Sequence, residues 1–212
     1  MLMRRLTVVL TSALALVLSG CGTQSSGSPP RRLAESFSEL IDSYLSHPAS
    51  NDFEREVFER ARATGRIDQA DYDEAFSRYT HCMASGGKPI TIKRLPNGLY
   101  WEGNVTVYPG ESSEQVENLA LNCARISKGF IPEAYGIQQE NRELTGDPFE
   151  VAYRCLERSD LVPQGYSAKQ FAKGFREPKV GGGSSLDDMP FDFKSDEVQA
   201  CLVGANMSVA VQ

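Results

Sequence analysis

Five cysteines are the residues of this 212-residue chain with the most distinctive chemistry. One of them, Cys21, directly follows an apolar run near the start of the chain. The other four occur in segments with helical periodicity: Cys82, Cys123, Cys155 and Cys201. A zinc site needs ligands at short spacing, and the chain has no C-x-x-C pair and only two histidines. We therefore expect no metal site and look for other chemistry at these residues.

Residues 1–20 have the pattern of a signal peptide. Arg4 and Arg5 provide positive charge at the start, and a mostly apolar run follows as far as Leu18. Because a helix needs about 20 apolar residues to span a bilayer, a permanent transmembrane helix is the weaker interpretation. A twin-arginine signal is an alternative, but the residues after Arg5 favour ordinary Sec export.

The stretch Leu18-Ser19-Gly20-Cys21 has an aliphatic residue, two small residues and then a cysteine. It resembles the lipobox of bacterial lipoproteins. The resemblance implies that the Cys21 thiol accepts a diacylglycerol, that the mature protein begins there, and that its acyl chains hold it at the outer face of the cell membrane. An ordinary cleavable signal with a stray cysteine is the alternative. Residues 21–30, rich in Ser, Gly and Pro, are interpreted as a flexible tether.

Without Cys21 the cysteine count is even, and an extracytoplasmic location favours disulfides. Four cysteines allow three pairings. Cys82 and Cys155 each follow an aromatic residue in a helix-like stretch, and each precedes another cysteine, Cys123 and Cys201 respectively. This pattern looks like a weak internal duplication, with halves at 51–130 and 147–212. We therefore favour Cys82–Cys123 with Cys155–Cys201, each stabilising by about 4 kcal/mol in the chain-entropy model.

No catalytic motif is recognisable in the sequence. The chain lacks both G-x-S-x-G and G-x-x-x-x-G-K-[ST], and neither histidine lies in a known pattern with Ser and Asp. The acidic residues at 68–74 lack the spacing of a calcium loop and are explained by a helix start. A glycosidase would need two buried carboxylates in one cleft, and the sequence spacing of the acidic residues does not show whether two of them meet there. We assign no catalytic residue, no metal ligand and no cofactor.

The charge of the chain disfavours some classes of partner. Removal of Arg4 and Arg5 with the signal leaves 20 basic residues against 28 acidic ones, a net charge of about −8. An acidic chain without a Lys/Arg cluster is a poor candidate for binding nucleic acid or an anionic lipid surface. We therefore expect the lipid to provide membrane attachment. Residues 31–212 form a chain long enough to bury a hydrophobic core, and we expect them to fold as one extracytoplasmic domain with two sub-halves.

Hydrophobic periodicity predicts a mainly α fold with a small β-hairpin, an α+β arrangement. Helices are expected over 31–46, over 51–63, from 68 to the glycines at 86–87, over 112–128, from 147, over 167–175 and over 195–204. Residues 129–146 and 177–190 are expected to be connections, and residues 207–211 a short strand. The domain is therefore predicted to be mainly helical and to be held together by its two disulfides.

The predicted hairpin turns at Asn97-Gly98, a pair that favours tight turns between strands. Alternation along the second strand places Trp101 on the apolar face and Tyr100 and Tyr108 on the polar face. We therefore expect the tryptophan to be structural and the two tyrosines to form an exposed binding patch.

The segment that begins at Phe53 and includes Cys82 reads F-E-x-E-V-x-E-R-A-x-x-T-G-x-I followed by A-D-Y-D-E-A-F-x-x-Y-x-x-C-M. It is similar to uncharacterised lipoproteins and secreted proteins of high-GC Gram-positive actinobacteria, as are residues 120–123 and 152–156. The resemblance implies export and disulfides but supplies no catalytic residues.

These observations predict a non-enzymatic lipoprotein of the cell envelope that binds a partner or an envelope component. Two alternatives remain open: a bacteriocin-type immunity or transporter-accessory lipoprotein, and an exported hydrolase that acts on cell wall or peptide.

Overall fold

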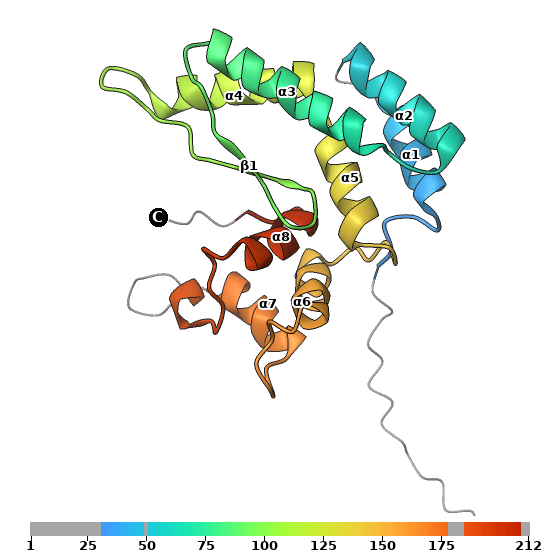
Figure 1. Ribbon diagram of the computed structural model, residues 1–212, viewed down its shortest axis with the longest axis vertical. Helices are drawn as coiled ribbons and strands as arrows, with labels where there is room; N and C mark the ends of the chain where they lie inside the picture. Colours follow the sequence, from blue (N-terminus) through green and yellow to red (C-terminus); the bar gives the residue numbers. More distant parts are fainter. Residues whose placement is uncertain (1–30, 49–50, 178–184, 209–212) are drawn as a thin grey trace, which may run out of the picture.

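The computed structural model describes residues 31–48, 51–177 and 185–208 (Figure 1). These residues form eight α-helices, one turn of 3-10 helix and a two-stranded antiparallel sheet. The elements are α1 Phe37–Ser46, α2 Asp52–Thr64, α3 Gln69–Ser85, β1 Ile92–Arg94, β2 Tyr100–Glu102, α4 Ser113–Ser127, α5 Ile131–Glu140, α6 Pro148–Arg158, α7 Ala168–Arg176, η1 Ser185–Asp188 and α8 Asp196–Gly204. The predicted fold class, mainly helical with a small hairpin, is confirmed.

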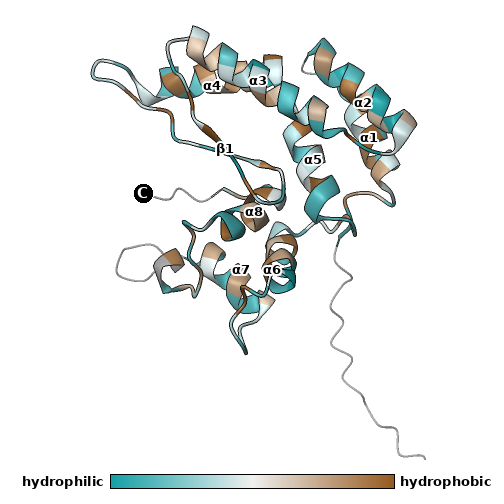
Figure 2. Cartoon of the chain, in the orientation of Figure 1, coloured by the Kyte–Doolittle hydropathy of each residue, from teal (hydrophilic) through white to brown (hydrophobic). Residues whose placement is uncertain are grey.

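Several predicted features lie outside the described residues: the signal peptide at 1–20, Cys21, the tether that follows it and residues 209–211 of the expected strand. Residues 207 and 208 are described and belong to no strand. In the ranges that the structure describes, no helix is long and apolar enough to cross a bilayer. Hydrophilic and hydrophobic residues are interspersed along the helices (Figure 2).

The first of two large cores lies among α1 to α5 and the hairpin. At its centre the Tyr72 ring stacks on Tyr100 and Tyr135, at centroid distances of 5.5 and 4.4 Å. The Cys82–Cys123 disulfide joins α3 to α4 with 5.6 Å between the Cα atoms, and the two helices lie side by side (Figure 1). The aromatic residues of α3, Tyr72, Phe76 and Tyr79, are therefore part of this core.

The second core lies among α6, α7, α8 and the segment after η1. Phe171 is fully buried there, and its ring lies 5.0 Å from Phe175 and 5.7 Å from Phe191. The Cys155–Cys201 disulfide joins α6 to α8 with 5.4 Å between the Cα atoms. Each core thus has its own disulfide, and the pairing favoured from the sequence is confirmed.

Residues 131–140 form α5, where a connection was expected, so that prediction was wrong. A proline in the first turn is compatible with a helix start, and the Glu54 carboxylate accepts a hydrogen bond from the Phe130 N–H at 2.5 Å although the two residues are 76 apart in the chain. Gly136 faces the end of α8, where a Cβ atom would lie 3.6 Å from the Gly204 carbonyl oxygen. Contacts with distant parts of the chain therefore stabilise this helix, and the local sequence does not reveal them.

Helix α1 begins six residues later than predicted. Ser36 is its N-cap and accepts a hydrogen bond from the Glu39 N–H at 3.1 Å. Before it, Arg32 forms an isolated antiparallel bridge with Thr145, and the Leu33 N–H donates to the Leu144 carbonyl at 2.8 Å. This pairing fixes the start of the described chain to the loop between α5 and α6.

Candidate ligand-binding cleft

A cleft of about 580 Å³ opens between the hairpin, the junction of α4 with α5, and the end of α8. This volume is in the range typical of small-molecule sites, roughly 300–1,000 Å³. Figure 1 shows that the hairpin descends from α3 towards α8, so the elements around the cleft come from both cores. The cleft therefore depends on how the two cores pack against each other.

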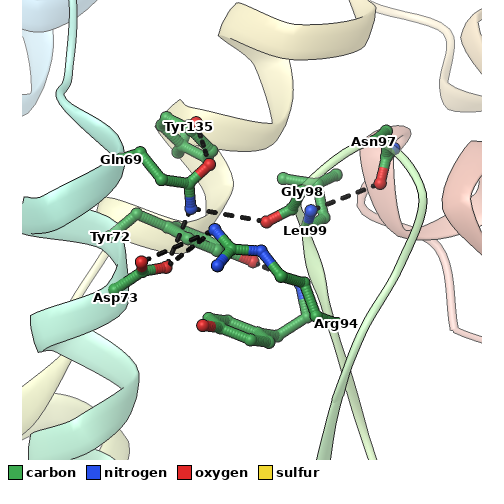
Figure 3. A network of polar contacts seen from close by, with 9 residues as sticks. Gln69, Tyr72, Asp73, Arg94, Asn97, Gly98, Leu99 and Tyr135 are labelled. Carbon is green, nitrogen blue, oxygen red and sulfur yellow. Dashed lines mark hydrogen bonds and ion pairs between the residues drawn. The ribbon is translucent and has the colours of Figure 1, made fainter.

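A polar network fixes the hairpin to α3 and α5 (Figure 3). The Tyr135 hydroxyl donates to Gln69 Oε1 at 2.7 Å, and Gln69 Nε2 donates to the Gly98 carbonyl at 3.4 Å. Next to it, the Tyr72 hydroxyl accepts the backbone N–H of Tyr100 at 2.8 Å. These contacts determine where β2, the strand that lines the cleft, lies relative to the helices.

The turn of the hairpin is fixed to the second core by Asn97. Its Nδ2 donates to the Ala200 carbonyl of α8 at 2.9 Å and to Glu140 Oε1 at 3.1 Å. Its Oδ1 accepts the Leu99 N–H at 3.3 Å, which stabilises the turn itself. One side chain therefore shapes the turn and also sets its distance from α8.

One ion pair lies on the side of the cleft next to the first core. Lys128, which ends α4 and is 8% exposed, pairs with the Glu102 carboxylate of β2. Its ammonium also lies 4.0 Å from the centroid of the Tyr79 ring. Burial lowers the pKa of Lys128, while Glu102 opposes that shift. Burial, reinforced by Glu102, raises the pKa of Tyr79 to about 12. The two opposite charges of the pair compensate each other inside the cleft.

On the opposite side, α8 contributes a buried amide with one unused acceptor. Gln199 is 4% exposed and its Nε2 donates to the Phe193 carbonyl at 2.5 Å. Among the residues that the structure describes, Gln199 Oε1 is the one buried side-chain oxygen or nitrogen without a hydrogen-bond partner. A buried acceptor without a partner costs roughly 1–3 kcal/mol. Oε1 itself is not exposed to solvent, so a donor on a bound molecule would remove that cost once the Gln199 side chain turned this atom towards the cleft.

Neutral polar side chains lie at the edge of the cleft. Asn104 follows β2 and Asn206 follows α8, and both are exposed. Neither side chain forms a hydrogen bond with another residue in the described ranges. Asn206 has a φ of 56°, a left-handed conformation that asparagine tolerates better than most residues. These amides add free donors and acceptors to the cleft.

The aromatic residues of the hairpin are arranged differently from the prediction. Tyr100 is only partly exposed and packs against the first core, so the interpretation of its face as the solvent side was wrong. Trp101, expected to be structural, is half-buried and lines the cleft. Tyr108 is 50% exposed, and the Lys88 ammonium lies 4.0 Å from its ring centroid. The two tyrosines therefore have different surroundings, and Tyr100 alone of the pair lines the cleft.

The acidic side chains that line the cleft already have partners. Glu102 pairs with Lys128, and Glu133 Oε1 accepts a hydrogen bond from the Tyr44 hydroxyl at 3.0 Å. Within the described part of the chain, no group of three or more His, Cys, Asp or Glu side chains is arranged to hold a metal ion. The chemistry that the cleft itself offers is hydrogen bonding and ring stacking.

Comparison of the chain with protein-family models, with curated proteins and with solved structures finds no match.

Proposed function

We propose that this chain is a bacterial lipoprotein, held at the outer face of the cell membrane by lipid on Cys21, that binds an envelope component in its cleft without catalysing a reaction. The lipobox-like sequence before Cys21 supports the location. The two disulfides support it independently, because structural disulfides persist mainly in oxidising compartments.

One observation carries the binding role. The buried Gln199 Oε1 has no partner among the described residues, and it belongs to a side chain that lines a cleft of ligand size. Trp101 and the Lys128–Glu102 pair lie on the walls of the same cleft. Pockets with an apolar wall and a few well-placed polar groups are the usual form of small-molecule sites.

The location is tested by fractionating cells that produce the Cys21→Ser variant. The variant should leave the membrane fraction and appear outside the cell, whereas Ser25→Ala, a change in the proposed tether, should stay with the membrane. Retention of Cys21→Ser in the membrane would contradict lipid anchoring.

The binding role is tested by photo-crosslinking on intact cells. A photoreactive amino acid replaces Asn104 at the edge of the cleft, and a matched variant carries it at Leu121, which is 60% exposed on α4 and does not line the cleft. The same envelope species should be captured repeatedly from position 104 and not from position 121. Equal capture from both positions, or capture from neither, would contradict a binding role of the cleft. Cleavage of the captured molecule would indicate the hydrolase alternative.

A further inference from the structure

We propose that the ligand of the cleft is a neutral carbohydrate, recognised by ring stacking on Trp101 and by hydrogen bonds to the amides of Gln199, Asn104 and Asn206. This inference rests on the proposed binding function and names the chemical class of the ligand. Three features of the cleft support it: its charge, its free hydrogen-bonding groups and its aromatic wall.

The charge of the cleft disfavours an anionic ligand. Among the described residues that line it, Lys128 is the single basic one, and its ammonium is already paired with Glu102. Glu133 adds a further carboxylate near the opening. A phosphate or carboxylate would therefore meet no free cation and would be repelled by Glu133. A cationic ligand would have to compete with Tyr44 for the Glu133 carboxylate.

The free polar groups are neutral amides, which suit hydroxyl groups. Gln199 Oε1 is a buried acceptor that needs a donor, and Asn104 and Asn206 each offer an acceptor and donors. A sugar hydroxyl both donates and accepts, so several hydroxyls on one ring can satisfy amides on opposite walls. An apolar ligand would leave Gln199 Oε1 unsatisfied.

The aromatic wall suits the apolar face of a sugar ring. Trp101 and Tyr100 are both partly exposed on β2 and line the cleft, and the Tyr100 ring packs against the buried rings of Tyr72 and Phe76. One face of many pyranose rings presents C–H groups, which pack against the negative face of an aromatic ring. Rings on one wall and amides on another therefore complement the two kinds of surface that a neutral sugar has.

The test is isothermal titration calorimetry of the protein as cells export it. Two neutral trisaccharides, maltotriose and N,N′,N″-triacetylchitotriose, are compared with the anionic trisaccharide trigalacturonic acid. At least one neutral probe should bind saturably, with an affinity that hardly changes between low and high salt, because the contacts are uncharged. Trigalacturonic acid should bind at least tenfold more weakly.

Variants connect this binding to the cleft. Asn206→Gly keeps the left-handed backbone, which glycine adopts readily, and should weaken binding about five- to tenfold through loss of the amide. Trp101→Ala should weaken it at least tenfold. Tyr108→Ala removes an exposed aromatic outside the cleft and should leave binding unchanged. Circular dichroism checks that each variant is folded.

The outcomes separate the two proposals. If neither neutral probe binds, or if trigalacturonic acid binds as tightly, while position 104 still captures an envelope molecule in cells, the carbohydrate inference fails and the binding function stands. If position 104 also captures nothing, both fail. Binding that Asn206→Gly and Trp101→Ala leave unchanged would also overturn the inference.

Discussion

The two disulfides should contribute nearly equally to stability, although they lie in different cores. They join cysteines separated by 41 and 46 residues. In the chain-entropy model, loops of this length raise the free energy of unfolding by about 4 kcal/mol each, and the difference in length changes that value by only about 0.1 kcal/mol. For a folded region of this size, a loss of about 4 kcal/mol lowers Tm by roughly 8–16 °C.

The assay compares the unmodified protein with two double variants, Cys82→Ala/Cys123→Ala and Cys155→Ala/Cys201→Ala. Alanine is chosen because three of the four cysteines are almost fully buried, so a polar replacement would add a desolvation cost. Guanidinium titration followed by circular dichroism gives the free energy of unfolding, and Trp101 fluorescence reports the hairpin separately.

A loss below about 1 kcal/mol in either double variant would refute the chain-entropy account. A difference of more than about 2 kcal/mol between the two variants would show that local packing, rather than loop length, determines the contribution of each bridge.

Three further predictions concern the contacts that shape the cleft. Asn97→Ala should lower the free energy of unfolding by about 1–3 kcal/mol in guanidinium titration because a carbonyl of α8 loses its donor. Asn97→Asp keeps the acceptor in the turn but should cost at least as much, because its carboxylate would face the Glu140 carboxylate and the Ala200 carbonyl. Gly129→Ala should be more destabilising than Gly65→Ala in the same assay. Both glycines have positive φ, so the backbone cost is similar. A Cβ atom at Gly129 would collide with the Glu54 carboxylate, whereas one at Gly65 would meet open space. Burial raises the pKa of Tyr72, so the phenol ionises at a lower pH in the unfolded chain than in the folded protein. The contribution of Tyr72 to the free energy of unfolding is therefore complete below about pH 10 and should decline by about 1.4 kcal/mol per pH unit above it. Tyr72→Phe should flatten this part of a profile of unfolding free energy against alkaline pH.

The sequence predicted the disulfides and most helices because the relevant signals are local. The Ser112–Gln115 capping box marks the start of α4, and Asp147 followed by a proline marks the start of α6. The pairing of Cys82 with Cys123 followed from their order along two helix-like stretches. For α4 and α6, the residues that mark the start of the helix lie within it or next to it.

The predictions for the start of α1 and for residues 131–140 both failed. The start of α1 is marked by its local N-cap Ser36, whereas α5 depends on distant residues. Leu33 bonds to Leu144, and Glu54 accepts the N–H at the start of α5. A periodicity argument considers one segment at a time, so partners elsewhere in the chain do not enter it.

The cleft was missed for a related reason. Alternation predicted opposite faces for Tyr100 and Trp101, but it does not say which face the helices cover. Helix α3 covers the Tyr100 face through the Tyr72 hydroxyl and ring. Gln199 had no distinguishing pattern in the sequence, because its unused acceptor appears only when α8 packs near the hairpin. Trp101, the single tryptophan of the chain, was the one available signal, and it was interpreted as structural.

The single tryptophan also provides the most direct test that the cleft is a binding site. Fluorescence emission of Trp101 is measured while the protein is titrated with soluble material released from cell envelopes. The account predicts a saturable blue shift as the indole is covered, and no shift in Trp101→Phe/Tyr108→Trp, where the indole lies outside the cleft. Emission that stays constant in the original protein, or that shifts equally in the control variant, would contradict the claim that the cleft binds an envelope component.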